Sequence, residues 1–102
     1  MKYSIEKDDS SCKIVIKGDI NFEASKELKQ AFDSLLKDGV KNIVLDLTDV
    51  PVSSSTGIGT LLMLYKKLKQ IDGSLKIDGI HKNLYSMLKL VKIDSLIDIN
   101  PH

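Results

Sequence analysis

The segment Ile43-Val44-Leu45-Asp46-Leu47, followed after Pro51 by Ser53-Ser54-Ser55-Thr56-Gly57, decides how this chain folds. Residues 43–47 are apolar almost throughout, which is typical of a central, parallel β-strand that is covered on both faces. Pro51 breaks the strand, and the serine run after it leads into a stretch with helical periodicity over residues 56–71. The segment therefore predicts a central strand, a polar turn and a long helix.

Upstream of this segment, the sequence predicts a hairpin and a first helix. Polar and apolar residues alternate over 3–5 and 12–17, on either side of a polar turn, which is typical of two antiparallel strands. Apolar residues then recur at helical spacing over 24–36. Asn21 has the side chain of an N-cap for this helix, and Gly39 has the conformational freedom needed just beyond its end.

Downstream, the long helix is expected to end at Asp72-Gly73. Its apolar stripe is expected to consist of Ile58, Leu61, Leu62, Tyr65 and Leu68. A short strand over 75–78, a third amphipathic helix over 84–91 and an edge strand over 96–99 complete the pattern. This order predicts one α/β domain over residues 1–102, with a mixed four- to five-stranded sheet and helices packed on it.

Composition argues against several classes of function. The 102 residues carry a net charge of +1, from 15 basic residues, all of them lysine, and 14 acidic ones. A basic face for nucleic acid is therefore not expected. No apolar run approaches the roughly 20 residues that cross a bilayer, and the N-terminus lacks a signal-peptide pattern. We expect a cytoplasmic protein with no membrane insertion and no direct contact with nucleic acid.

The metal-ligating residue types are too sparse to form a site. Cys12 is the only cysteine, and it alternates in phase with apolar neighbours, which predicts a buried thiol. His81 and His102 are far apart in the sequence, and His81 is expected at the solvated start of the last helix. No metal site, disulfide or cofactor is expected.

The serine turn has two interpretations that the residue types leave open. The first N–H groups of a helix lack partners within the helix, so Ser54 or Ser55 is expected to cap it. The same free N–H groups and the positive end of the helix dipole also accept a phosphate. A phosphoserine here would be tolerated by the fold and would change the charge of a surface that a partner approaches.

A catalytic turn is not expected. The sequence lacks the Gly-x-Ser-x-Gly pattern of a hydrolase elbow and the Gly-Lys-Ser/Thr ending of a phosphate loop. Gly57 and Gly59 form a Gly-x-Gly pair, but Leu62 stands where a dinucleotide fingerprint requires a third glycine. These two glycines are instead expected to let the start of the helix pack closely against a neighbouring strand. We therefore expect a binding protein and not an enzyme.

Over essentially its full length, the chain resembles the STAS domains of bacterial anti-sigma factor antagonists. Those domains carry an Asp-Ser-Ser/Thr-Gly-Leu-Gly segment after the central strand, and the matching stretch is Ser54-Ser55-Thr56-Gly57-Ile58-Gly59. The strand 43–47, the turn Gly18-Asp19-Ile20 and the tail Leu88-Lys89-Leu90-Val91-Lys92-Ile93-Asp94 match in kind and order. The resemblance implies a STAS fold and regulation by protein binding.

The resemblance also implies specific site residues and partners. Ser55 stands at the phosphoacceptor position, and the implied kinase is the anti-sigma factor that the unphosphorylated antagonist binds. A phosphatase would reset the cycle. The implied partner-binding surface is the helix-start turn, with these members: Asn21, Ser53, Ser54, Ser55, Thr56, Gly57, Ile58 and Gly59.

Two positions depart from the family pattern. Ser54 replaces the Asp before the phosphoacceptor, and Asn21 replaces a second family Asp. Two alternatives remain, and these replacements motivate the first of them. One is a STAS scaffold or accessory subunit of a signalling or transport complex that is not phosphorylated. The other is a small-ligand or nucleotide-binding module that uses the helix start at Gly57 and Gly59. The partner's identity and the oligomeric state are not predicted.

Overall fold

The computed structural model describes residues 1–102, which form five strands, three α-helices and one short 3₁₀ helix. In chain order the elements are β1 (Lys2–Asp8), β2 (Ser11–Lys17), α1 (Phe22–Lys37), β3 (Asn42–Asp49), α2 (Ser55–Gln70), β4 (Ser74–Ile80), α3 (Lys82–Leu90), η1 (Ile93–Ser95) and β5 (Asp98–Asn100). The predicted α/β organisation is confirmed.

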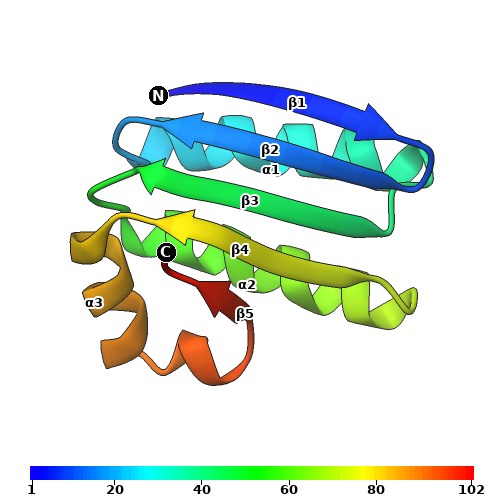
Figure 1. Ribbon diagram of the computed structural model, residues 1–102. Helices are drawn as coiled ribbons and strands as arrows, with labels where there is room; N and C mark the ends of the chain where they lie inside the picture. Colours follow the sequence, from blue (N-terminus) through cyan, green and yellow to red (C-terminus); the bar gives the residue numbers. More distant parts are fainter.

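The strands form one mixed sheet in the order β1-β2-β3-β4-β5. β1 and β2 are an antiparallel hairpin, and the pairs β2–β3, β3–β4 and β4–β5 are parallel. Parallel neighbours need a crossover connection, which α1 supplies for β2–β3, α2 for β3–β4, and α3 with η1 for β4–β5. Both helices lie behind the sheet in Figure 1, and α3 lies at one end of it.

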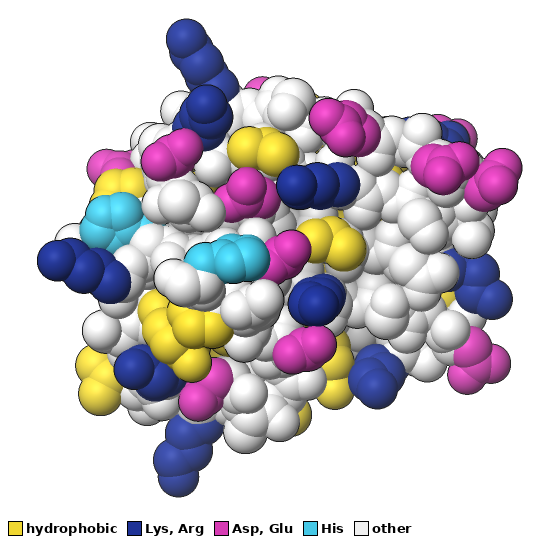
Figure 2. All heavy atoms as spheres, viewed as in Figure 1, with side chains coloured by type: hydrophobic (Ala, Val, Ile, Leu, Met, Phe, Trp, Pro, Cys, Tyr) yellow, Lys and Arg dark blue, Asp and Glu magenta, His cyan; other side chains and the backbone are white.

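Only one face of the sheet is covered by helices, so the prediction that both faces of the central strand are buried was wrong. In β3, Leu45 and Leu47 are fully buried, whereas Val44 and Asp46 on the other face are only half-buried. Figure 2 shows this open face, where lysine and acidic side chains surround small apolar patches. The chain tolerates it because most residues of β2 and β3 on this face are polar, Val15 and Val44 being the exceptions.

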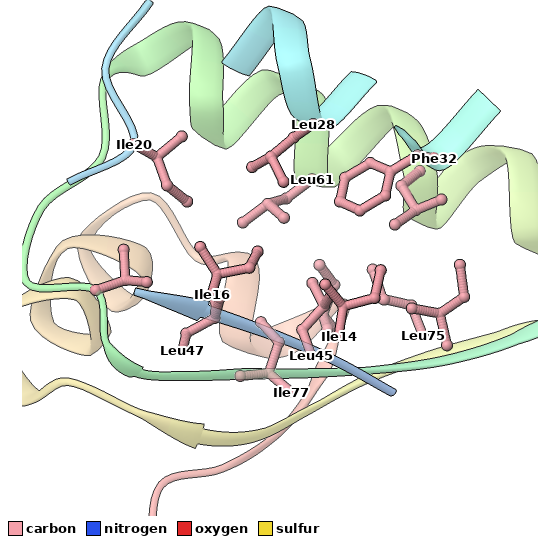
Figure 3. Close-up of a cluster of buried hydrophobic side chains, with 14 of the residues drawn as sticks. Ile14, Ile16, Ile20, Leu28, Phe32, Leu45, Leu47, Leu61, Leu75 and Ile77 are labelled. Carbon is pink, nitrogen blue, oxygen red and sulfur yellow. The ribbon is translucent and has the colours of Figure 1, made fainter. Parts of the chain in front are cut away.

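The core fills the space between the sheet and the two long helices. Figure 3 shows side chains of the strands, among them Ile14, Leu45 and Ile77, facing Leu28 and Phe32 of α1. These residues are at most 2% exposed. The structure contains no helix that is long and apolar enough to cross a membrane.

The helix ends follow the predicted capping chemistry. The Asn21 side chain accepts a hydrogen bond from the backbone N–H of Ala24 at 2.8 Å. Gly39 follows the C-cap Asp38 with φ +86°, a conformation that glycine adopts without strain. At the start of α3, His81 is the N-cap and its Nδ1 accepts from the N–H of Asn83.

The buried stripe of α2 differs from the predicted one. Leu61 and Leu68 are buried as expected, but Leu64 is also buried. Ile58, Leu62 and Tyr65 only pack at the margin of the core. The helix is apolar over much of its circumference, so periodicity alone placed its buried face incorrectly.

The serine turn and the helix starts at the sheet edge

The functional candidate lies where the β2–α1 and β3–α2 loops meet. Because β2 and β3 are parallel, the loops that follow them leave the same edge of the sheet. Ile20 and Ser53 form an isolated parallel bridge there. The N–H of Ile20 donates to the carbonyl of Val52 at 3.0 Å, and the N–H of Ser54 donates to the carbonyl of Ile20 at 2.7 Å. These bonds hold the starts of α1 and α2 next to each other.

Ser54 caps α2, as the sequence predicted for Ser54 or Ser55. Its backbone is extended, and its hydroxyl accepts a hydrogen bond from the N–H of Gly57 at 3.1 Å. Its carbonyl accepts the first helical bond, from the N–H of Ile58. The capping role is thus filled by Ser54, which leaves the Ser55 hydroxyl free of it.

Ser55 is the first residue of α2 and is exposed. Its hydroxyl makes no hydrogen bond within the chain, and the backbone N–H groups of Ser55 and Thr56 have no partner in the chain either. Free N–H groups at a helix start carry the positive end of the helix dipole. The geometry can therefore accommodate negative charge on the Ser55 oxygen.

A chain of hydroxyl groups connects the two helices beneath this position. Thr56 Oγ1 lies 2.8 Å from Ser54 Oγ, and it accepts a hydrogen bond from Ser25 Oγ of α1 at 3.3 Å. Ser25 is 3% exposed, and its single hydroxyl proton is shared between Thr56 Oγ1 and the carbonyl of Phe22, 2.6 Å away. The turn is therefore fixed to α1 by side chains as well as by the backbone.

The two glycines of the turn have different environments. A Cβ atom on Gly57 would lie 2.8 Å from Ile20 Cγ2 and would overlap the Ser53 hydroxyl. Close packing of the helix start, predicted for both glycines, therefore holds for Gly57. It is wrong for Gly59, which is exposed and has nothing within 4 Å of such an atom.

The predicted site residues are brought together, but they differ in accessibility. Asn21, Ser55, Thr56 and Gly59 are exposed, and Ser54 and Ile58 are half-buried. The side chain of Ser53 and all of Gly57 are buried. A partner can therefore touch the first group directly, whereas Ser53 and Gly57 act by shaping the turn.

Sequence reasoning missed two exposed apolar side chains beside the turn. Phe22 is 51% exposed at the start of α1, and Val52 is 46% exposed in the β3–α2 loop. Both neighbour the Ile20–Ser53 bridge in the sequence. The available signal was the phase of Phe22, which lies outside the apolar stripe of its helix. The two side chains thus add exposed apolar surface to the segments that form the turn.

Charge at the turn is sparse. The first turn of α2 contains no acidic residue, and Glu23 is the acidic residue in the first turn of α1. No group of three or more His, Cys, Asp or Glu residues could hold a metal ion. Cys12 lies near the start of β2. Burial raises the pKa of its thiol, although the positive charge of Lys7 acts to lower it. The turn is thus a surface that offers hydroxyl groups, free N–H groups and apolar side chains.

The whole chain matches known proteins. The family model of the STAS domain matches residues 2–102. The anti-sigma-B factor antagonist of Listeria monocytogenes is 26% identical over 95 residues, which are 92% of this chain and 82% of that protein.

Two solved structures share the fold. An anti-sigma factor antagonist from Mycobacterium paratuberculosis superposes with a TM-score of 0.85 at 22% identity, covering 99% of this chain and 86% of that one. The phosphorylated form of SpoIIAA from Bacillus gives 0.79 at 12% identity, covering 99% and 93%. On the match of its full length to the family model, the chain belongs to the STAS domain family.

Proposed function

We propose that this protein is an anti-sigma factor antagonist, which binds an anti-sigma factor with serine kinase activity and is switched by phosphorylation of Ser55. The observation that carries the proposal is the exposed hydroxyl of Ser55 at the start of α2, beside free backbone N–H groups. The names of the Listeria relative and of the Mycobacterium paratuberculosis structure support the same class of function, and the Bacillus SpoIIAA structure is named as a phosphorylated form.

The switch acts on the surface and not on the fold. A phosphate on Ser55 adds about −1.5 to −2 charges at neutral pH. The free N–H groups of Ser55 and Thr56 and the helix dipole offset this charge, so the domain stays folded. The partner meets a bulky anion at the start of α2, where it previously met a small hydroxyl. Binding is thereby lost, and a phosphatase restores it.

The role of the chain in this cycle is to be bound and modified. The chemistry of phosphoryl transfer resides in the partner kinase, and this chain supplies the acceptor hydroxyl. The start of α2 is held in place by several contacts, which supports that role. The Ile20–Ser53 bridge, the Ser54 cap and the contact between Ser25 and Thr56 hold the acceptor in one position. A fixed acceptor lowers the entropy that a kinase must remove to align it.

A second function is favoured by one observation, the absence of carboxylates at two positions. Asn21 and Ser54 are both N-caps here, so each uncharged side chain has a complete structural role. In this alternative the domain is a constitutive binding subunit of a signalling or transport complex, and Ser55 only contacts the partner.

One experiment separates the two functions. The protein is incubated with the anti-sigma factor of its own organism and ATP, and the product is mapped by mass spectrometry. The switch predicts one phosphate, on Ser55, and none on a Ser55→Ala variant. Complex formation with no phosphate on the chain supports the constitutive subunit instead. Comparison of Ser55→Ala and Ser55→Asp in the same binding assay then shows whether charge at this position matters.

A further inference from the structure

β1 leaves one complete backbone edge of the sheet without a partner. β1 pairs with β2 on one side over all seven of its residues, Lys2–Asp8, and it is the first strand in the sheet order. Its outer N–H and C=O groups therefore face solvent, which makes the strand a template for another extended segment. At the other end of the sheet, β5 is only three residues long.

The helix-facing side of β1 is also incompletely covered. Tyr3 and Ile5 pair with the buried Ile16 and Ile14 of β2, so they lie on the face that carries α1 and α2. Yet Tyr3 is 36% exposed and Ile5 is 37% exposed, because the helices do not extend over the edge. Two apolar side chains are thus left at the rim of the core.

Charges on an edge strand usually prevent a second strand from adding to it. In β1, Lys2–Asp8, opposite charges face each other at the two ends when the strand runs antiparallel to a copy of itself with Ile5 opposite Ile5. Lys2 then lies opposite Asp8, Tyr3 opposite Lys7, and Ser4 opposite Glu6. This register uses all seven residues and keeps the helix-facing residues of both copies on one side.

The neighbouring registers are less favourable. Moving the centre to Ser4 leaves only five paired residues of β1, and moving it to Glu6 places two glutamates directly opposite each other. Like charges in directly opposite positions destabilise a strand pair. A centre between two residues would place helix-facing side chains of one copy opposite solvent-facing ones of the other.

We propose that β1 is a homodimerisation edge, at which two copies of this chain join their sheets through an antiparallel β1–β1 pair centred on Ile5. The exposed sides of Tyr3 and Ile5 from both copies then pack against each other across the joined edge, between the two helical layers. Lys7 remains paired with Asp38, 3.5 Å away at the end of α1. The proposed pair uses residues of β1 and none of the serine turn.

An edge of this size gives a weak dimer. One strand pair buries less than the roughly 1,200 Å² of the smallest stable interfaces, so association is transient and concentration-dependent. Sedimentation equilibrium of the full chain, from micromolar to millimolar concentration, measures it. We expect a reversible monomer–dimer equilibrium that weakens with added salt, because two copies of the Lys2–Asp8 pair are exposed.

Charge reversal tests the register without disturbing the core. Lys2→Glu and Asp8→Lys each place like charges opposite one another twice in the dimer, and each is expected to raise the dissociation constant by roughly tenfold. The double variant restores both pairs and should recover the affinity of the unmodified protein. If the double variant dimerises no better than the single ones, the register is wrong.

A single introduced cysteine gives the sharpest result. In the proposed pair, Ile5 of one copy lies opposite Ile5 of the other, on the two-fold axis of the dimer. The two Cα atoms of an Ile5→Cys variant are therefore about 5 Å apart, which suits a disulfide. In the control Lys2→Cys the two positions are about 20 Å apart. Native Cys12 is 5% exposed, so the unmodified protein is the control for oxidation that does not involve the introduced cysteine. Mild oxidation should link Ile5→Cys much faster than Lys2→Cys. Equal rates, or faster linkage at Ser4→Cys, would overturn the proposal.

Discussion

The backbone N–H of Ser54 donates a 2.7 Å hydrogen bond to the carbonyl of Ile20, so the cap of one helix is fastened to the loop that starts another. This bond sets the position of Ser55 relative to Phe22, although Ser54 lies 32 positions after Phe22, the first residue of α1. The candidate surface is therefore a product of two loops that only the parallel pairing of β2 and β3 brings together.

The first prediction concerns the division of labour between adjacent serines. Ser54→Ala removes the side chain that caps Gly57 N–H, and we expect the free energy of unfolding to fall by about 1 kcal/mol. Ser55→Ala removes a hydroxyl without a partner and should change it by less than about 0.5 kcal/mol. Urea denaturation of the two variants measures both values. A larger loss of stability for Ser55→Ala than for Ser54→Ala would show that Ser55, and not Ser54, caps the helix.

The second prediction uses the two glycines as a matched pair. Gly57→Ala forces a methyl group against Ser53 and Ile20, and we expect a loss of about 1–3 kcal/mol in stability. Gly59→Ala meets nothing within 4 Å and replaces a poor helix former, so a gain of up to about 1 kcal/mol is expected. Thermal and urea denaturation provide the measurement. A similar effect of both changes would contradict the close packing at Gly57.

The third prediction concerns the hydroxyl contact between the helices. Ser25→Ala removes the buried partner of Thr56, while Ser34→Ala changes a serine of the same helix that has no side-chain hydrogen bond. We expect Ser25→Ala alone to destabilise the fold by about 1 kcal/mol. It should also increase hydrogen exchange at the N–H groups of Gly57 and Ile58, which are hydrogen-bonded at the start of α2. Unchanged exchange there would show that Thr56 does not connect the helices.

The fourth prediction is a loss of stability in acid. A hydrogen bond from Lys67, 3.1 Å away, lowers the pKa of Asp33. Burial raises the pKa of Asp46, but hydrogen bonds from the hydroxyl and the N–H of Thr48 outweigh it, so its pKa is also lowered. A carboxyl group with a lowered folded pKa stabilises the fold above its ordinary pKa, and that stability is lost as pH falls.

We therefore expect the free energy of unfolding, measured by urea titration, to decline as pH falls below about 4. Asp33→Asn and Lys67→Gln should each make this decline shallower. Lys66→Gln is the control, because Lys66 is exposed beside Lys67 and forms no ion pair. A decline that is the same in Asp33→Asn and the unmodified protein would show that this ion pair does not set the acid sensitivity.

The sequence predicted local features that depend on near neighbours. The hairpin, the Asn21 and Ser54 caps and the Gly39 helix end are all confirmed, because their causes lie within a few residues. The full-length resemblance to STAS domains is confirmed by the family model. These features required no knowledge of how distant segments pack.

What sequence reasoning missed depends on tertiary contacts. Leu64 is buried and Leu62 is not, because the tilt of α2 on the sheet decides which side of an apolar helix faces inward. Val44 lies on an open face because both crossovers place their helices on the other side. Ser25 and Phe22 join the site only through the Ile20–Ser53 bridge, for which no local pattern exists.

The central claim is that the surface around Ser55 binds an anti-sigma factor and that phosphate on Ser55 ends the binding. Isothermal titration of the unmodified protein and of the Ser55-phosphorylated protein, against the anti-sigma factor of its own organism, tests it directly. We expect measurable affinity for the unmodified protein and at least a tenfold loss of affinity, about 1.4 kcal/mol, after phosphorylation. Equal affinity of the two forms, with Ser55 verified as phosphorylated, would contradict it.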